Sequence, residues 1–380
     1  MMKKNIQFIK VEKEKGEDLK KLLNNDFKKL RIINQDYQIE YDGDYILFPI
    51  KTLPDEQYNE LKKALKNQLS IEIITKKANS KKKGEKSSLE DILREKLPND
   101  VLNIIPRSYD VIGSIAIVEF DRFSELSQKK STKYKNQVAS AIIQLNKGLK
   151  SVYEKKSEIK GIYRLREFSI LKGPDNPETI HKENKCMFKL DIKETYFSPR
   201  LVYERNRIAT SQFNENENIV DLFAGVGPFS IQIAKNHPVN IHSFDINPAA
   251  YKYLEDNIRL NEVNDKITAH NLDVKNLVDK KSILGETLKN SMDRVIMNLP
   301  EKSVNYIDVA CFLLKESGGI LHYYLFNEKS SRIEHTIQNL KMKFNEEKYY
   351  IAEILSSRKV KGYSPKIDLL SLDLCLRLKK

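Results

Sequence analysis

The apolar residues of positions 1–75 follow helical and strand-like patterns in turn. One predicted helix face consists of Leu19, Leu22, Leu23 and Phe27. A second predicted helix starts at Pro54, and its apolar face consists of Leu61, Leu65 and Leu69. The runs YDGDYILFPI and SIEIIT, which follow the first and the second helix, are strand-like. These patterns indicate a small α+β domain.

Positions 76–88 differ in composition, because the run KKANSKKKGEK holds six Lys against one Glu and no large apolar residue. Such a run predicts a solvated linker. A flexible arm that contacts phosphates is the alternative, since like charges attract a polyanion.

Residues 89–192 again mix helices and strands. Ser87 and Glu90 have the spacing of a capping box before the apolar helix face of LEDILREKL. We expect one buried strand in SYDVIGSIAIVEF, a Lys-rich helix over residues 133–150, and further strands in YRLREFSIL and CMFKLDI. This pattern predicts a second α+β module that ends near Ile192.

From residue 193 onward, apolar strands alternate with helices. The expected strands are ENIVDLFAG, NIHSFDI, KITAHNLD, MDRVIMNLP and GILHYYLF, and the expected helices cover residues 229–236, 248–261 and 304–315. This alternation predicts an α/β fold with a mostly parallel sheet and helices on both faces. The closing segment RKVKGYSPKIDLLSLDLCLRL predicts a terminal antiparallel hairpin.

Composition narrows the function classes. The 380 residues are 40% apolar, yet no run approaches the roughly 20 apolar residues of a membrane span, which argues against membrane transport. The net charge of +13 makes nucleic acid a candidate partner, although a Lys-rich chain also fits an AT-rich genome. Because Cys186, Cys311 and Cys375 lie far apart, we expect no metal site. The charged amino terminus favours the cytoplasm or nucleus and leaves a mitochondrion-type organelle open.

The segment DLFAGVGPFS, residues 221–230, places two glycines between a predicted strand and a helix. Gly225 and Gly227 would let the backbone approach a ligand next to a helix start, which favours a nucleotide-like ligand. Ser230 stands where a dinucleotide fingerprint has Gly or Ala, which disfavours NAD. A tight structural turn is the alternative for this segment alone.

Three further polar residues follow the ends of the next strands. Asp245 lies 18 residues after Gly227, Asp273 lies 28 residues after Asp245, and Asn298 ends the fourth strand before Leu-Pro. Open parallel sheets bind ligands at this edge, so the set predicts a nucleoside-bearing cofactor, with acids for the ribose and the adenine. Each acid alone could instead cap a helix, and Asn298 could simply end its strand.

Two arginine-containing segments precede the parallel block. YFSPRLVYERNRI combines Glu204 with Arg205 and Arg207, and YRLREF holds Arg164 and Arg166. Spacing alone also allows ordinary surface ion pairs.

Together, YRLREFSILKG, YFSPRLVYERNRI, DLFAGVGPFS, FDINP, NLD and MNLP resemble the archaeal and eukaryotic tRNA (guanine-37) N1-methyltransferases. The resemblance is dense over residues 97–300 and continues more weakly through KGYSPKIDLLSLDL, whereas residues 1–86 match mainly in size and position. It implies a Rossmann-like class I methyltransferase domain (193–380), preceded by a tRNA-recognition domain (1–75), the linker (76–88) and an RNA-binding domain (89–192). The stretch 276–292 is longer than in archaeal members, and the Lys-rich run has no counterpart.

The resemblance also implies roles for individual residues. The implied cofactor-binding residues are Arg205, Asp221, Gly225, Gly227, Asp245, Ile246, Asp273, Val274 and Asn298. Glu204 would be the general base, Tyr196 would position the target base, and Asn298 and Pro300 would hold its edge. Arg164 would stabilise charge on guanine O6, with Arg166 as the alternative.

The implied reaction moves a methyl group from S-adenosylmethionine to N1 of guanine 37 of tRNA. A carboxylate beside N1 can remove its proton while a guanidinium stabilises charge on O6, and no metal is required. Extra basic domains would grip the RNA while one nucleotide is splayed into the pocket of a monomeric enzyme. The alternatives are an aminocarboxypropyl transferase acting on modified guanine 37 and a non-catalytic RNA-binding protein.

Overall fold

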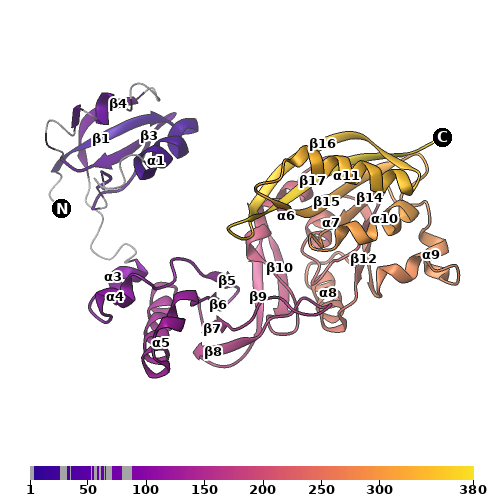
Figure 1. Cartoon of the computed structure of the whole chain (residues 1–380), viewed down its shortest axis with the longest axis horizontal. Coiled ribbons are helices and arrows are strands. Elements are labelled where there is room, and N and C mark those ends of the chain that lie inside the picture. The colour runs from indigo at the N-terminus through magenta and orange to yellow at the C-terminus, as the bar shows by residue number, and fades with distance from the viewer. Residues whose placement is uncertain are drawn as a thin grey trace. The chain divides into compact units, whose positions relative to one another are not determined.

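The computed structural model describes residues 4–25, 32–34, 36–52, 54, 58, 59, 61–63, 65, 71–78 and 88–380. The chain divides into two compact units, Met1–Ser88 and Leu89–Lys380. Figure 1 shows the elements of each unit. The units are considered one at a time below.

The first unit is built on a four-stranded antiparallel sheet in the order β2-β3-β1-β4. Its elements are β1 (Lys4–Glu12), η1 (Lys13–Lys15), α1 (Gly16–Asn25), β2 (Glu40–Asp42), β3 (Tyr45–Ile50) and β4 (Ile71–Ala78). Leu19 of α1 is fully buried in the same core as Ile9 and Phe48 of the sheet. Leu61 and Leu65 are buried there too, whereas Phe27 and Leu69 lie outside the described residues. The predicted α+β domain is therefore present.

The boundary of the predicted linker is wrong at its start. Lys76 and Lys77 belong to β4, which pairs with β1 as far as Ala78 opposite Lys4. Ala78 is buried, and the exposed Lys76 places its Nζ 2.9 Å from Glu40 Oε2 on β2. Lysine content alone could not reveal this pairing. Residues 79–87 lie outside the described part of the chain.

The second unit begins with a smaller mixed sheet in the order β5-β6-β7-β8. Its elements are α3 (Leu89–Leu93), α4 (Asn99–Leu102), β5 (Asp110–Ile112), β6 (Ile115–Val118), η3 (Asp121–Glu125), α5 (Gln128–Leu145), β7 (Ser151–Lys155) and β8 (Phe168–Lys172). Val138, Ala141 and Ile142 of α5 face a core shared with the sheet, as predicted. A further hairpin, β9 (Glu178–Glu183) with β10 (Cys186–Asp191), follows.

Two local predictions in this part are wrong. The run SYDVIGSIAIVEF forms two antiparallel strands, β5 and β6, because the chain reverses at Gly113 with φ +55°. A Cβ there would lie 2.3 Å from Thr179 Oγ1, so a side chain would have no room. The segment YRLREFSIL is strand only from Phe168 onward, and Arg164 lies in a turn before it.

The largest sheet has seven strands in the order β13-β12-β11-β14-β15-β17-β16. Its strands are β11 (Glu217–Asp221), β12 (Val239–Asp245), β13 (Ile267–Asn271), β14 (Arg294–Met297), β15 (Gly319–Glu328), β16 (Tyr349–Gly362) and β17 (Ile367–Leu378). Strands β11 to β15 are parallel, and β17 and β16 add the terminal antiparallel hairpin. Both features confirm the predicted class of sheet.

Helices cover both faces of this sheet (Figure 1). They are η4 (Pro199–Leu201), α6 (Val202–Ala209), α7 (Ser230–Asn236), α8 (Pro248–Leu260), η5 (Val274–Val278), α9 (Ile283–Leu288), η6 (Ser303–Tyr306), α10 (Ile307–Leu313) and α11 (Ile333–Glu346). Neighbouring residues Ile219 and Val220 of β11 belong to separate cores, one with α7 and α8 and the other with α10 and α11. Helix α11 was not predicted.

The β9–β10 hairpin forms a separate two-stranded sheet, and hydrogen bonds attach it to helix α8 and the residue after it. Asn257 of α8 accepts from the Lys189 backbone N–H at 2.7 Å and donates to its carbonyl at 3.0 Å. Asn261 makes the same pair of bonds to Met187, at 2.9 and 2.7 Å. Because these amides are buried, each lost bond would leave an unsatisfied polar group. Among the described residues, no helix is long and apolar enough to cross a membrane.

Candidate active site

A cavity of about 180 Å³ lies at the carboxyl ends of the parallel strands. The predicted site residues that line it are Arg164, Tyr196, Arg205, Gly225, Asp245, Ile246, Asp273, Val274 and Asn298. The predicted residues that do not line it are Glu204, Asp221, Gly227 and Pro300. The strand ends thus come together as expected, and the exceptions each have a physical reason.

The glycines of the loop after β11 serve different purposes. Gly225 has φ +57°, and a Cβ there would meet only the Tyr196 carbonyl oxygen, at 3.7 Å, so its face is open to the cavity. Gly227 has φ +89°, and its Cβ would lie 2.6 Å from Leu254 Cδ1 and 2.9 Å from Ile231 Cδ1. Gly225 therefore permits close approach of a ligand, whereas Gly227 permits close packing of helices.

Asp245 is held by backbone donors at the end of β12. The Gly225 N–H donates to Asp245 Oδ2 at 2.7 Å, and the Asn247 N–H donates to Oδ1 at 2.8 Å. Burial raises the pKa of Asp245, and these two bonds oppose that shift. A carboxylate oxygen has room for a second donor, so both oxygens can still accept ribose hydroxyls.

Asp221 lies buried next to the cavity but does not line it. It is fully buried, and its Oδ2 accepts from the Ser230 hydroxyl at 2.9 Å. Ser243 in turn donates to Ser230 at 2.8 Å. Burial raises the pKa of Asp221 to about 7. The prediction that Asp221 contacts a cofactor is wrong for this arrangement, because its carboxylate is enclosed between β11, α7 and β12.

An apolar slot lies beside Asp273. Val274 is buried and lines the cavity with Leu272, Phe223 and Tyr306. The Phe223 and Tyr306 rings meet edge to face, with centroids 4.9 Å apart. Asp273 Oδ1 accepts from the Lys275 N–H at 3.0 Å, so it also caps η5. The slot suits a flat purine, and sequence reasoning missed both aromatic residues although Phe223 lies within the DLFAG motif.

Arg164 faces the cavity from a strained turn. Its φ is +59°, a conformation that side-chain-bearing residues seldom adopt. Its guanidinium carbon lies 4.7 Å from the centre of the Tyr196 ring, and its Nη2 donates to Glu301 Oε1 at 3.2 Å. Its buried Nε has no partner within the described residues. Arg166 does not line this cavity, so of the two predicted arginines the structure places Arg164 beside the strand ends. Sequence reasoning missed Glu301.

Glu204, the predicted base, does not face the cavity. It is 1% exposed, and it accepts from Arg207 Nη2 at 2.7 Å and from the Tyr324 hydroxyl at 2.9 Å. Burial would raise its pKa, but the bonds and charge of Arg207 and the bond from Tyr324 outweigh burial and lower it. Tyr324 packs against Phe229, with ring centroids 5.7 Å apart, and Phe229 lines the cavity. The carboxylate thus lies one side chain behind the cavity wall.

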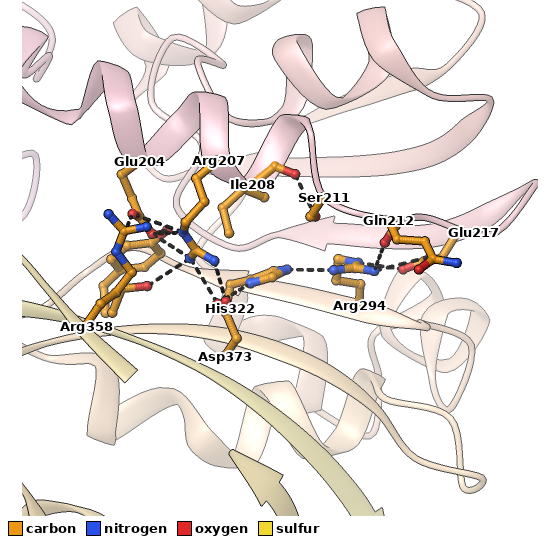
Figure 2. A network of polar contacts seen from close by, with 12 residues as sticks. Glu204, Arg207, Ile208, Ser211, Gln212, Glu217, Arg294, His322, Arg358 and Asp373 are labelled. Atoms are coloured by element: carbon orange, nitrogen blue, oxygen red, sulfur yellow. Dashed lines mark hydrogen bonds and ion pairs between the residues drawn. The ribbon is translucent and has the colours of Figure 1, made fainter. Parts of the chain in front are cut away.

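A chain of buried and half-buried polar side chains continues from Glu204 across the sheet (Figure 2). Arg207 also pairs with Asp373, whose Oδ1 lies 2.6 Å from His322 Nδ1. His322 Nε2 lies 2.8 Å from Arg294 Nη1, and Arg294 Nε donates to Glu217 Oε1 at 2.6 Å. Because a guanidinium can only donate, His322 Nε2 is the acceptor and the ring is neutral. Burial lowers the pKa of His322 in agreement with this assignment.

Arg205 lines the cavity, but other groups already use most of its donors. Its Nε and Nη2 donate to the two oxygens of Glu183 at 2.5 and 2.6 Å, and both Nη atoms donate to the Ser198 carbonyl at 3.1 Å. These bonds use four of its five donors, and Arg205 lines the cavity, so its role in cofactor binding stays a prediction. Arg205 also fixes the segment that carries Tyr196 against the β9–β10 hairpin. Pro300 does not line the cavity; its carbonyl accepts from the Phe326 N–H at 3.4 Å.

A second, larger cavity of about 670 Å³ adjoins the first. The two share Arg164, Tyr196, Phe197 and Ser198 as lining residues. Its cationic lining residues, apart from Arg164, are Arg107, Lys155, Arg166, Arg200 and Lys361. A polyanion could therefore lie in the larger cavity while one of its bases reaches the smaller one. Within the described residues, no cluster of three or more metal-ligating side chains occurs.

Comparison with known proteins identifies the family. A curated relative from Methanocaldococcus jannaschii, tRNA (guanine(37)-N(1))-methyltransferase Trm5b, is 34% identical over 368 residues, or 96% of this chain and 97% of the relative. The chain belongs to this methyltransferase family. Three family models match it: the TRM5/TYW2 methyltransferase domain at 179–352, the TYW2 N-terminal domain at 89–176, and the tRNA methyltransferase 5 N-terminal domain at 9–59.

Two further relatives show which members of the family match the whole chain. A solved complex of aTrm5 with tRNALeu has a TM-score of 0.62 and 33% identity, covering 97% of this chain and 99% of that chain. A tRNA(Phe) (4-demethylwyosine(37)-C(7)) aminocarboxypropyltransferase from M. jannaschii is 34% identical but matches only 68% of this chain, although that is 93% of the relative. The Trm5b relative thus extends over nearly the whole chain, and the aminocarboxypropyltransferase does not.

Proposed function

We propose that this chain transfers the methyl group of S-adenosylmethionine to N1 of guanine 37 in tRNA. The observation that carries the proposal is the placement of Arg164 and Tyr196. Both line the cavity at the strand ends, next to Asp245 and Asp273, and both also line the cationic cavity. A nucleoside cofactor in the first cavity would therefore lie beside an RNA base that enters from the second.

The residues of the first cavity fit S-adenosylmethionine, the family's methyl donor. Asp245 offers oxygens to the ribose, the Phe223–Tyr306 slot accepts the adenine, and Gly225 leaves open space in front of its backbone. When bound, the cofactor supplies a methyl carbon activated by a positively charged sulfur. The chain's own residues then have to orient the guanine, stabilise the charge on O6 and accept the N1 proton.

Arg164 can stabilise that charge. Its guanidinium lines the cavity over the Tyr196 ring, and among the described residues its one hydrogen bond is from Nη2 to Glu301, so further N–H donors remain for O6. A positioned donor that meets the oxygen as charge develops stabilises the transition state more than the ground state. The Glu301 carboxylate limits the motion of the guanidinium before RNA binds.

Two carboxylates compete for the role of base. Glu204 is the one that the family resemblance assigns, and it must lose its bond from Arg207 to reach a guanine in the cavity. Glu301 already lines the cavity. Catalytic hydrogen bonds commonly form fully only when the substrate binds, so the position of Glu204 in the free protein does not exclude it as the base. Glu301 is the second candidate.

The aminocarboxypropyl transferase is the weaker reading, because that relative matches only 68% of this chain. The test is incubation of the full chain with tRNA and S-adenosylmethionine labelled either in the methyl group or in the aminocarboxypropyl chain. Transfer of methyl label alone supports the proposal. Transfer of the aminocarboxypropyl label, or of neither label, overturns it.

A further inference from the structure

The larger cavity is lined by six Lys and Arg residues and by four Asp and Glu residues. Arg200 Nε is paired with Asp110 Oδ1 at 2.7 Å, and Lys155 Nζ is paired with Glu119 Oε1 at 2.5 Å. Within the described part of the chain, Lys361, Arg166 and Arg107 line the cavity without an ion pair to an acid. Arg107 is exposed, whereas Lys361 and Arg166 are partly buried, so these two are the enclosed cations that a ligand could neutralise.

Lys361 lies near the end of β16 and is turned into the cavity. Its Nζ donates to the Ser198 hydroxyl at 3.2 Å. The charged groups that act on it are Arg200, Asp110, Arg205 and Arg166, and the other titratable residues that line the cavity are Arg107, Tyr109, Glu119, Asp121, Lys155, Glu158, Arg164, Tyr196 and Tyr363. Asp110 is paired with Arg200, and Glu183 neutralises Arg205.

Burial of this lysine is unfavourable without an anion. Burial, followed by the charges of nearby arginines, lowers the pKa of Lys361 to about 8. A cation in such a place is stabilised when a negative group enters and completes its hydrogen bonds. Arg166 lines the same cavity, is close enough for its charge to act on Lys361, and adds a guanidinium that suits phosphate oxygens.

We infer that Lys361 and Arg166 together bind one backbone phosphate of the RNA, adjacent to the nucleotide whose base reaches Arg164 and Tyr196. This inference rests on the proposed function, since it takes RNA as the polyanion. The shared lining of the two cavities supports it, because a base in the first carries its sugar and phosphates towards the second. The site would act on binding and orientation of the RNA rather than on the cofactor.

The test uses the full chain and an anticodon stem-loop series in which one loop phosphate at a time is replaced by an uncharged methylphosphonate. The variants are Lys361→Met and Lys361→Arg. Lys359→Met is the matched control, because Lys359 is on the same strand but pairs with Asp368 at 2.8 Å and does not line the cavity. Binding of RNA and of S-adenosylmethionine is measured by titration calorimetry.

Lys361→Met should weaken RNA binding about 10- to 100-fold, as expected for loss of a charged hydrogen bond. It should also lower the slope of log affinity against log salt by about 0.7 and leave cofactor affinity unchanged. One methylphosphonate position should weaken binding to the wild type but cause no further loss with Lys361→Met. Equal RNA affinity of Lys361→Met and Lys359→Met, or equal loss at every phosphate in both proteins, would overturn the inference.

A pH series serves if Lys361→Met does not fold. Lysine binds phosphate only when protonated, so the RNA affinity of the wild type should fall as pH rises through about 8, the pKa of Lys361. Lys361→Arg stays charged and should show no such fall between pH 7 and 9. Identical pH profiles would overturn the inference. Failure of the wild type to bind RNA would instead overturn the proposed function, so the two failures are distinguishable.

Discussion

Replacing Asp245 with Asn tests whether this residue holds the cofactor ribose. The carboxylate accepts the Gly225 and Asn247 backbone N–H groups at 2.7 and 2.8 Å through separate oxygens. An Asn side chain has one acceptor oxygen, so one N–H donor would face an amide NH₂, and one ribose hydroxyl would lose its acceptor. A hydrogen bond to a charged group contributes about 1.5–3 kcal/mol, so S-adenosylmethionine affinity should fall about 10- to 100-fold.

The assay is titration calorimetry with S-adenosylmethionine, without RNA, alongside thermal unfolding. Asp273→Asn is the control, since among the described residues Asp273 accepts one hydrogen bond, from the Lys275 N–H, and Asn caps a helix almost as well as Asp. We expect a smaller loss of affinity for that variant. If Asp245→Asn binds as tightly as the wild type while remaining folded, Asp245 does not hold the ribose.

Four further substitutions test other parts of the site. Glu204→Gln and Glu301→Gln distinguish the two candidate bases. Replacing the true base should lower the rate of single-turnover methyl transfer by roughly two to four orders of magnitude and leave cofactor affinity near normal. If both variants react as fast as the wild type, neither residue is the base. For Asp221, burial raises the folded pKa to about 7, above its unfolded value, so the charged form destabilises the fold as pH rises from about 4 to 7. The unfolding free energy of Asp221→Asn minus that of the wild type should therefore grow over this range and level off above it; a difference independent of pH would contradict the burial of Asp221. Gly227→Ala should destabilise the chain by about 1–3 kcal/mol in a denaturant titration, because its Cβ would lie 2.6 Å from Leu254 at a positive φ, and unchanged stability would show that the loop relaxes freely.

The strand-end residues could be predicted from sequence because the underlying rule is local. Asp245, Asp273 and Asn298 each follow an apolar run, and parallel strands bring their carboxyl ends to one edge of the sheet. The same logic placed Gly225 at the cavity. For these residues, the order of strands along the sequence was enough to predict that they meet at one edge of the sheet.

The surroundings of Glu204 could not be predicted in this way. Its partners Tyr324 and Arg358 come from strands more than 100 residues away, and Asp373, which shares Arg207 with it, comes from β17. Only the order of β15, β17 and β16 in the sheet brings these groups under α6. The turn at Arg164 was likewise missed, because a positive φ at an arginine has no sequence signature.

The same limit explains Arg205. In the sequence, the carboxylate nearest to Arg205 is its neighbour Glu204. In the structure, Arg205 instead pairs with Glu183, on the β9–β10 hairpin. Strand β9 itself, ETIHKE, lacks a strong apolar run and was not predicted. Residues whose role depends on such a partner need the three-dimensional structure.

The central claim is that a guanine at position 37 receives a methyl group at N1 inside the cavity at the strand ends. The most direct test is a single-turnover reaction of the full chain with two tRNA transcripts that differ only at nucleotide 37, G or A, followed by nucleoside mass spectrometry and mapping of the product. The account predicts 1-methylguanosine at position 37 of the first transcript and no product with the second. Methylation of a different nucleotide, or equal modification of both transcripts, would contradict it.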